Sequence, residues 1–498
     1  MTGWLPPDVV LPLLVALPLG AAALSMLVAG RLGLQRTLSL VTLGAMQVLS
    51  LLVLAGAWDG SVLSVRIGDV DATIGIVLAA DPLGAIMLAV SCLLLWTVMV
   101  YAIGSSRTKD QAPSFHPLYL VLAGGVAASF LSADLFNLFV AFEVMLVASY
   151  VLITLGGSRA QVRHGMTYVV IGLLASTLFI TSVGLVYAAT GQVNLAAVAL
   201  AMEEVPDGIR TPLGLLLLVM FGVKAAIFPL FQWLPDSYPA APSPVTALFA
   251  GLLTKVGVYA IIRTQTLLFP TGGRASVVLL TLAALTMTVG VLGAIAQNDV
   301  KRILSFHIVS QIGYMIFGLG LFTLAGVAGA VLYVVHHIVV KTTLFLVGGL
   351  VEEGAGTAAL DRLGGGVHTA PLLSVLFLLP ALSLAGIPPF SGFVAKLSLA
   401  QSGIAAGQWA VTAVALGVGL LTLFSMTKIW NGVFWGDPDD AEVRLDGPVG
   451  SRSMTAATTV LVVASLAFVV VAGPLYAFSE RAADVLLGRD SYIEAVGG

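Results

Sequence analysis

The sequence predicts an all-α integral membrane protein with about fourteen transmembrane helices, and three observations lead to this fold class. Hydrophobic residues make up 59% of the 498 residues, and charged residues only 9%. A soluble domain carries roughly a quarter charged residues, so most of this surface must face lipid. Apolar windows of about 20 residues, the length that crosses roughly 30 Å of hydrocarbon as a helix, recur along the whole chain. This excludes a soluble enzyme, and the net charge of −3 gives no reason to expect a nucleic-acid partner.

Fourteen apolar windows define the predicted membrane spans. In chain order they cover residues 9–29, 37–57, 84–104, 117–132, 134–154, 165–190, 211–232, 244–263, 275–296, 302–322, 326–350, 371–400, 410–434 and 456–477. Residues 1–498 are predicted to form one membrane domain, because the longest hydrophilic stretches are only 436–453 and a short acidic tail after Phe478. The division at 132–134 rests on Ser132 and Asp134 alone. Joining the two windows there would reverse the membrane orientation of every later helix.

The loops differ in their content of basic residues. Loops after odd-numbered spans hold eleven, namely Arg31, Arg36, Arg107, Lys109, Arg159, Arg163, Lys301, Arg302, Arg362, Arg444 and Arg452. Loops after even-numbered spans, including the flanking residues at 263–274, hold only Arg66, Arg210, Arg263 and Arg274. Since cytoplasmic loops are enriched in Lys and Arg, we expect a multi-pass protein of a bacterial plasma membrane with both termini outside.

Six charged side chains fall inside the apolar windows, away from the residues at the window ends. They are one carboxylate, Glu143, and five lysines, Lys224, Lys255, Lys341, Lys396 and Lys428. A charge at the centre of a bilayer costs at least ~2.5–3.5 kcal/mol, so each must be paired, neutral or in contact with water. A lysine near a helix end can instead extend its ammonium to the interface, which is the interpretation we favour for Lys428. The other lysines lie in mid-span and indicate a function.

Glu143 is predicted to pair with a buried lysine. A carboxylate alone in an apolar site stays protonated, and a lysine alone there stays neutral, but together both can carry charge. An ion pair of variable strength can release and recapture a proton. The alternative is a static salt bridge, although buried pairs are no more stabilising than apolar packing.

Prolines interrupt two spans beside the lysines. Pro229 follows Lys224 by five residues, and Pro388-Pro389 precede Lys396. In a membrane, the backbone groups that proline frees are tolerated where they line water or bind a cation. Spans seven and twelve are therefore predicted to be discontinuous, and their spacing predicts two inverted five-helix repeats, helices 4–8 (117–263) and 9–13 (275–434). The repeats follow N-terminal helices 1–3 (1–110) and precede the last helix, 456–477; a plain packing kink at each proline is the alternative.

Histidines add candidate proton carriers, because their ordinary pKa lies near 6.5. His307 lies in the tenth span, and His336 and His337 lie in the eleventh. Lys341 follows His337 by four residues, so these two can share a helix face. Each histidine could instead be a core residue whose ring nitrogens are hydrogen-bonded within the protein.

No cofactor, metal site or redox centre is predicted. The one cysteine, Cys92, cannot supply a set of cluster or zinc ligands. Residues 354–359 match G-x-G-x-x-A, but no strand precedes them, and the chain has no P-loop. We therefore expect neither enzymatic redox chemistry nor ATP-driven transport.

These features resemble the antiporter-like subunits that Mrp-type multisubunit Na⁺/H⁺ antiporters share with respiratory complex I. The resemblance covers almost the whole chain and rests on the order of the charged residues and on three stretches, FGVKAA at 221–226, APSPVTAL at 241–248 and NDVKR at 298–302. The stretches WLPDSYP at 233–239 and KVGVY at 255–259 look most like the D-type subunits of the antiporter.

The resemblance implies the proton-translocating subunit of a cation/proton antiporter, a partner of other membrane subunits, with H⁺ and Na⁺ as transported ions. It implies that Glu143 and Lys224 form a pair on helices five and seven, that Lys255 is a central relay, and that Lys396 is the terminal proton donor. An M- or N-type subunit of complex I, or of a related membrane-bound hydrogenase, is the alternative. An autonomous substrate/cation symporter is less well supported, because a Na⁺ site needs several oxygen ligands whereas lysines repel cations.

Overall fold

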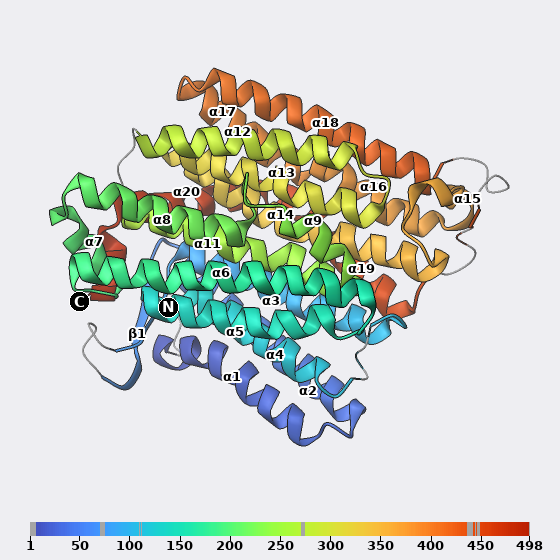
Figure 1. The fold of residues 1–498 in the computed structure, drawn as a ribbon, viewed down its shortest axis with the longest axis horizontal. Coiled ribbons are helices and arrows are strands. Elements are labelled where there is room, and N and C mark those ends of the chain that lie inside the picture. The colour runs from blue at the N-terminus through green and yellow to red at the C-terminus, as the bar shows by residue number, and fades with distance from the viewer. Residues whose placement is uncertain are drawn as a thin grey trace.

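The computed structural model describes residues 6–69, 75–108, 110, 112–269, 274–435, 442–443, 445 and 449–497. Within these residues, twelve helices are long and apolar enough to cross a membrane, and α4 and α16 are shorter apolar helices. Together they correspond to the fourteen predicted spans, and Figure 1 shows them side by side in one bundle. Among the basic residues counted above, Lys109 and Arg444 lie outside the described residues, as does most of 436–448.

The spans begin and end close to the predicted windows. They are α1 (Pro7–Leu27), α2 (Leu32–Gly56), α3 (Pro82–Gly104), α4 (Phe115–Leu131), α5 (Leu135–Thr154), α6 (Arg159–Thr190), α8 (Asp207–Ala225) with α9 (Trp233–Ser237), α10 (Ser243–Leu248) with α11 (Thr254–Leu267), α12 (Arg274–Ile295), α13 (Val300–Gly320), α14 (Leu324–Ala355), α16 (Pro371–Ala385) with α17 (Ser391–Ala405), α18 (Trp409–Val433) and α19 (Arg452–Val470). Short helices α7 (Leu195–Glu204) and α15 (Gly366–Thr369) lie between spans.

The turn at 132–134 separates two helices, as the sequence indicated. Ser132 ends α4 and donates its backbone N–H to the Ala128 carbonyl at 2.9 Å. Asp134 caps α5 by accepting the Asn137 N–H at 2.8 Å. Each helix end is thereby hydrogen-bonded within a three-residue turn, which is too short to interrupt hydropathy clearly.

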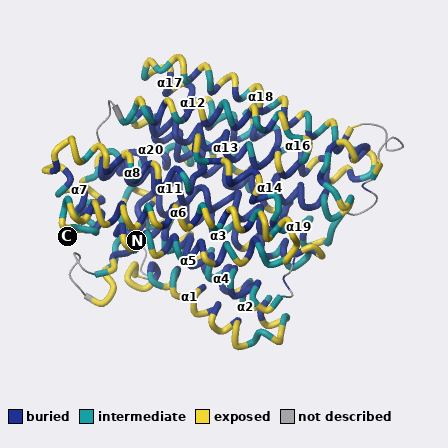
Figure 2. Tube along the Cα trace, in the orientation of Figure 1, coloured by how far each residue is buried: buried dark blue, intermediate teal, exposed yellow. Residues whose placement is uncertain are grey.

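Burial divides the bundle into a centre and a rim (Figure 2). The spans formed by α10–α11 and by α14 are buried along the whole of their apolar windows, and α3 and α13 nearly so. Helices α1, α2, α18 and α19 expose large apolar side chains, as lipid-facing helices do. The lysines of α11 and α14 therefore lie in the core of the protein and away from lipid.

Two features were not predicted from the sequence. The first is a β-hairpin in the segment between α2 and α3, in which β1 (Leu63–Arg66) pairs antiparallel with β2 (Val77–Ala80). The second is the chain after α19, for which a short acidic tail after Phe478 was expected: it forms α20 (Ala472–Gly488) and α21 (Asp490–Gly497), whose apolar faces pack on the bundle. Both termini, the hairpin and α7 lie toward one end of the bundle, here called the terminal end (Figure 1).

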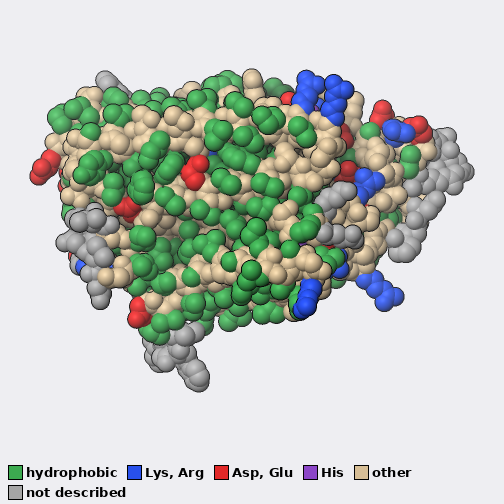
Figure 3. All heavy atoms as spheres, turned by 60° about the horizontal axis from the view of Figure 1, so that its bottom comes forward, with side chains coloured by type: hydrophobic (Ala, Val, Ile, Leu, Met, Phe, Trp, Pro, Cys, Tyr) green, Lys and Arg blue, Asp and Glu red, His purple; other side chains and the backbone are tan. Residues whose placement is uncertain are grey.

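The opposite end, here called the basic end, carries most of the Lys and Arg side chains visible in Figure 3. One residue was misplaced by the sequence analysis. Arg263 was counted with a loop, but it lies in α11 with only 2% of its surface exposed and forms an ion pair with Asp81.

Spans seven and twelve are both discontinuous, and their breaks share one backbone geometry. The residue after α8, Ala226, and the residue after α16, Gly386, have φ angles of 59° and 87°. The next residue in each break, Ile227 or Ile387, donates its N–H five residues back, to Gly222 or Leu382, at 3.1 Å. Both breaks contain a cis proline, Pro229 or Pro389. The likeness accords with a repeat of five spans, which stays a prediction for the remaining helices.

Candidate functional site

The charged residues of the first half meet at the end of α8. Lys224 is buried in the last turn of α8, and its Nζ donates to the Gly172 carbonyl at 3.1 Å and to Ser176 Oγ at 3.4 Å. The Ser176 hydroxyl also hydrogen-bonds Glu143 Oε1. The predicted pair is therefore brought together through a serine of α6 and not by direct contact.

Glu143 lies in the middle of α5, as predicted, but other parts of this chain cover it only in part. The residue is half-buried. A partly exposed carboxylate at mid-membrane depth must either be protonated or contact polar groups. This chain supplies only some of those polar contacts.

A cavity of about 20 Å³ lies beside Lys224. Its lining includes Tyr168, Trp233 and Tyr238 and ends at Leu253, in the turn that precedes Lys255. This volume holds about one water molecule. The cavity therefore offers a first step from Lys224 towards the centre of the bundle.

Lys255 owes its position to a local distortion of the eighth span. Residues Phe249–Leu253 form a π-helical turn, which leaves carbonyl groups without their usual partners. The Lys255 ammonium donates to the Ala250 carbonyl at 2.5 Å and to Thr254 Oγ1 at 3.2 Å. No acidic side chain of the described residues pairs with it, so this fully buried lysine is held by neutral oxygens.

His337 and Lys341 continue the series on α14. Both are fully buried, and within the part of the chain that the structure describes, neither ring nitrogen of His337 nor the Nζ of Lys341 has a hydrogen-bond partner. Buried polar atoms are nearly always satisfied, if not by protein then by ordered water. Ordered water is therefore the partner that these three nitrogen atoms would need.

His336 and Lys396 connect α14 to the broken twelfth span. His336 Nδ1 lies 2.9 Å from Ser391 Oγ at the start of α17. Lys396 Nζ donates to the carbonyls of Leu384 and Ala385 at 2.9 and 3.2 Å, groups that the break in the helix leaves free. Lys396 is half-buried and borders a cavity of about 220 Å³ between α17 and α18.

Aromatic rings fill the space between these groups. Lys396 Nζ lies 4.9 Å from the centroid of the Tyr314 ring, which stacks on Tyr333 at 5.2 Å. The Tyr333 ring in turn lies 5.6 Å from that of His336. His307 lies to one side, with Nε2 2.5 Å from Ser425 Oγ of α18.

Lys428 lies in the last turns of α18 and contacts the end of a neighbouring helix. Its Nζ donates to the carbonyls of Ile295 and Gln297, at 2.9 and 2.7 Å, where α12 stops. A lysine that caps the carboxyl end of a neighbouring helix has a structural role, so Lys428 stands apart from the others.

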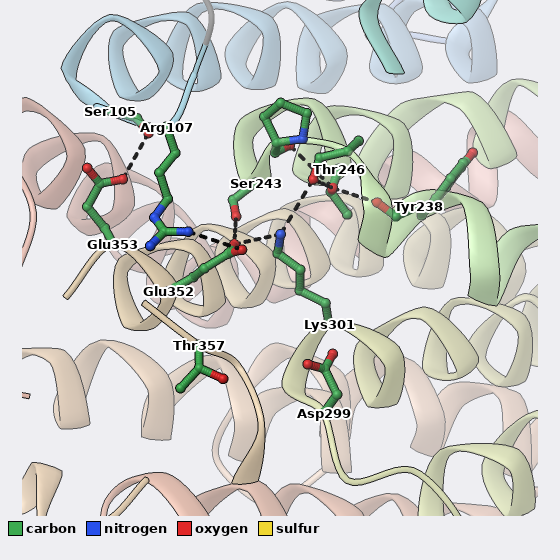
Figure 4. A network of polar contacts seen from close by, with 12 residues as sticks. Ser105, Arg107, Tyr238, Ser243, Thr246, Asp299, Lys301, Glu352, Glu353 and Thr357 are labelled. Atoms are coloured by element: carbon green, nitrogen blue, oxygen red, sulfur yellow. Dashed lines mark hydrogen bonds and ion pairs between the residues drawn. The ribbon is translucent and has the colours of Figure 1, made fainter. Parts of the chain in front are cut away.

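A second polar network, at the basic end, was missed by the sequence analysis (Figure 4). Lys301 Nζ lies 2.6 Å from Glu352 Oε2, which also accepts a hydrogen bond from Ser243 at 2.8 Å. Arg107 approaches the same carboxylate at 3.7 Å. Burial raises the pKa of Asp299, which caps α13 nearby. The signal was present in the adjacent acids at the end of span eleven and the lysine at the start of span ten.

The Asp81–Arg263 ion pair is the other buried pair that the sequence analysis missed. An arginine inside the eighth apolar window was the available signal. Among the described residues, no three His, Cys, Asp or Glu side chains gather in a way that could hold a metal ion.

Comparison with known proteins gives consistent results. Residues 132–422 match the family model described as NADH:quinone oxidoreductase/Mrp antiporter, TM. The D-type subunit of the Na⁺/H⁺ antiporter from Alkalihalophilus pseudofirmus is 41% identical over 490 residues, which are 98% of this chain and 99% of that protein.

Two solved structures have the same fold. A chain in the structure of the Mrp complex from Dietzia sp. superposes with a TM-score of 0.92 at 35% identity, covering 98% of this chain and 99% of that one. A chain of respiratory complex I from Thermus thermophilus gives 0.83 at 25% identity, covering 96% and 100%.

Proposed function

Because the chain belongs to the family of NADH:quinone oxidoreductase/Mrp antiporter membrane subunits, we propose that it is the proton-translocating, D-type subunit of a multisubunit Na⁺/H⁺ antiporter. The similarity to a named D-type antiporter subunit over nearly the full length of both chains carries this proposal. The complex I chain is also similar, but at 25% identity it is far more distant than the 41% of the antiporter subunit.

The proton route runs across the bundle, along Glu143, Lys224, Lys255, His337 with Lys341, and Lys396. Its two outer members, Glu143 and Lys396, are half-buried, whereas Lys255, His337 and Lys341 are fully buried. A proton can pass between buried lysines if each is neutral for part of the cycle and water fills the gaps. His336 contacts Ser391 and so helps to position the helix break beside Lys396. His307 lies beside this main route.

Glu143 and Ser176 act as the input switch of this route. When the carboxylate is charged and bonded through Ser176, it stabilises the protonated form of Lys224; when the link is lost, desolvation favours proton release. The half-exposed face of Glu143 is where a neighbouring subunit of the complex would complete the site. The Na⁺ path lies largely in other subunits, because the described axis is rich in lysine and poor in oxygen ligands.

The orientation follows from the basic residues. We place the basic end in the cytoplasm of a bacterium and the terminal end, with both termini, outside. The Lys301–Glu352 network is then at the cytoplasmic end of spans ten and eleven.

The test is exchange by the whole complex. The complex with Lys255→Met should assemble normally. In everted membrane vesicles that hold this complex, Na⁺ should no longer collapse the pH gradient that respiration builds up. Lys428→Met, which removes an ammonium of the same type from a helix end, is the matched control and should retain most of the exchange. Full exchange by Lys255→Met would refute the proposed route.

A further inference from the structure

A buried ion pair lies two turns along α11 from Lys255, on the side of the terminal end. Asp81 caps the start of α3 by accepting the Gly84 N–H at 3.0 Å, and its Oδ1 also accepts a hydrogen bond from Arg263 Nη2. The two side chains are 1% and 2% exposed. At 1.5 Å per residue, eight residues place Arg263 about 12 Å from Lys255 along the helix axis.

This pair is incompletely satisfied. Asp81 Oδ2 and Arg263 Nε have no hydrogen-bond partner among the described residues although both atoms are buried. A pair that served only to join α3 to α11 would be expected to use these atoms, since an orphaned charged group in the core is destabilising. The free Oδ2 is an open proton acceptor.

Tyr259 connects the pair to the lysine side. It lies one turn from Lys255 and one turn from Arg263 on α11, and its hydroxyl donates to the Phe130 carbonyl at 3.0 Å. A methyl group built on Gly84 would lie 3.2 Å from Asp81 Oδ1 and 3.8 Å from the Tyr259 hydroxyl. The same methyl group would lie 2.9 Å from the Phe130 carbonyl, so Asp81, the Tyr259 hydroxyl and its carbonyl partner all lie around one glycine that has no room for a side chain.

The C-terminal helix covers the pair on the other side. The Tyr492 ring of α21 lies 4.5 Å from Arg263 Cζ and is 2% exposed. Burial raises the pKa of Tyr492, so its hydroxyl keeps its proton. Two hydrogen bonds hold α21 in place: Ser64 Oγ donates to the Ala495 carbonyl at 2.6 Å, and Arg489, the residue before α21, donates to Glu203 at 3.1 Å.

We propose that Asp81, Arg263 and Tyr492 form a gate through which the proton route opens at the terminal end, with α21 as its cover. This rests on the proposed function, in which Lys255 carries protons. In the step, the N–H bond of the Lys255 ammonium breaks and an O–H bond forms at Asp81 Oδ2 through intervening water, which leaves a neutral amine and a carboxylic acid.

Protonation of Asp81 then opens the gate. The guanidinium of Arg263 cannot give up its own proton, so it is left as an unpaired buried charge. Its alternatives are the face of the Tyr492 ring and water beyond α21. When Asp81 passes its proton to that water, the carboxylate re-forms the ion pair, and the fixed positive charge then opposes return of the proton.

The test distinguishes a proton gate from an ion pair that only joins α3 to α11. Complete complexes carrying Asp81→Asn, the neutral pair Asp81→Asn with Arg263→Gln, or Tyr492→Ala are assembled in everted vesicles. Assembly, Na⁺-dependent exchange and the passive decay of the pH gradient without Na⁺ are measured. The control is Asp59→Asn, an exposed acid of the same end.

A gate predicts at least a tenfold loss of exchange in assembled Asp81→Asn and in the neutral pair, and at least threefold faster passive decay in Tyr492→Ala. Full exchange by the neutral pair, or loss of assembly in both Asp81 variants, would show that the ion pair only joins the two helices and would overturn the proposed gate. If Lys255→Met abolishes exchange while the Asp81 variants retain it, only the gate fails; if Lys255→Met itself retains exchange, the proposed function fails.

Discussion

Ser176 of α6 lies between Glu143 and Lys224, as acceptor for the lysine at 3.4 Å and as donor to the carboxylate. The hydroxyl is thus the shared contact of two charged groups that do not touch each other. Hydrogen bonds to charged groups contribute about 1.5–3 kcal/mol. The serine therefore has a large effect on the strength of the interaction between Glu143 and Lys224.

The first prediction concerns this serine. Ser176→Ala should lower the rate of Na⁺/H⁺ exchange in everted vesicles by about tenfold, because one bond to each charge is lost. Glu143→Ala should abolish exchange while the complex still assembles. Ser182→Ala is the control, since among the described residues the hydroxyl of this buried serine of the same helix bonds to the Leu178 carbonyl alone, at 2.6 Å. Unchanged exchange in Ser176→Ala would mean that the serine does not couple the pair.

The second prediction compares two lysines that both bond to carbonyl groups at helix ends. Lys396→Ala should stop exchange, because it removes the last ionisable group of the series. Lys428→Ala should cost stability and little activity, because it removes only the cap of α12. The rates and the midpoint of thermal unfolding of the purified complex distinguish these effects. Equal losses of exchange in the two variants would contradict the different roles.

The third prediction uses the missing hydrogen bonds of His337. His337→Leu should leave assembly intact, because no hydrogen bond to a described residue is lost, and should reduce exchange at least tenfold, because it removes the ring nitrogens that can carry a proton one turn from Lys341. His336→Leu should instead weaken the contact of α14 with α17, since it loses the bond to Ser391. Normal exchange in assembled His337→Leu would remove this histidine from the route.

The fourth prediction concerns the stability of the basic end. Lys301→Met should destabilise the complex by about 2–3 kcal/mol, somewhat less than a fully buried pair, because the Glu352 side chain is 23% exposed. Adding Glu352→Gln should recover part of the loss by removing the unpaired charge. The control is Asp207→Asn at the exposed pair with Arg210, for which a change below about 1 kcal/mol is expected in the same thermal assay.

The fifth prediction concerns the need for partners. The purified chain alone, reconstituted in liposomes, should show no Na⁺/H⁺ exchange, because Glu143 and Lys396 are only half-covered by this chain. Adding back the other subunits of the complex should restore exchange. Robust exchange by the single chain would contradict its assignment as a subunit and favour an autonomous transporter.

The spans, the two broken helices and the lysines of interest could be predicted from the sequence alone. Transfer of a helical segment from water to lipid depends on the residues of that segment, so hydropathy locates each span without knowledge of its neighbours. A lysine such as Lys255 in an apolar window is unfavourable wherever the window packs, and proline interrupts a helix in any fold. These properties are local, and the sequence determined them.

The tertiary structure alone decided which side chains meet. Asp81 and Arg263 are 182 residues apart, and Glu143 reaches Lys224 only through a serine of a third helix. Hydropathy indicates that a residue is inside the membrane, but not how far neighbouring helices cover it, which is why the partial burial of Glu143 was not predicted. The π-helical turn before Lys255 and the packing of α21 over Arg263 likewise depend on neighbouring helices, because helix packing sets rotation and depth by contacts between segments distant in the chain.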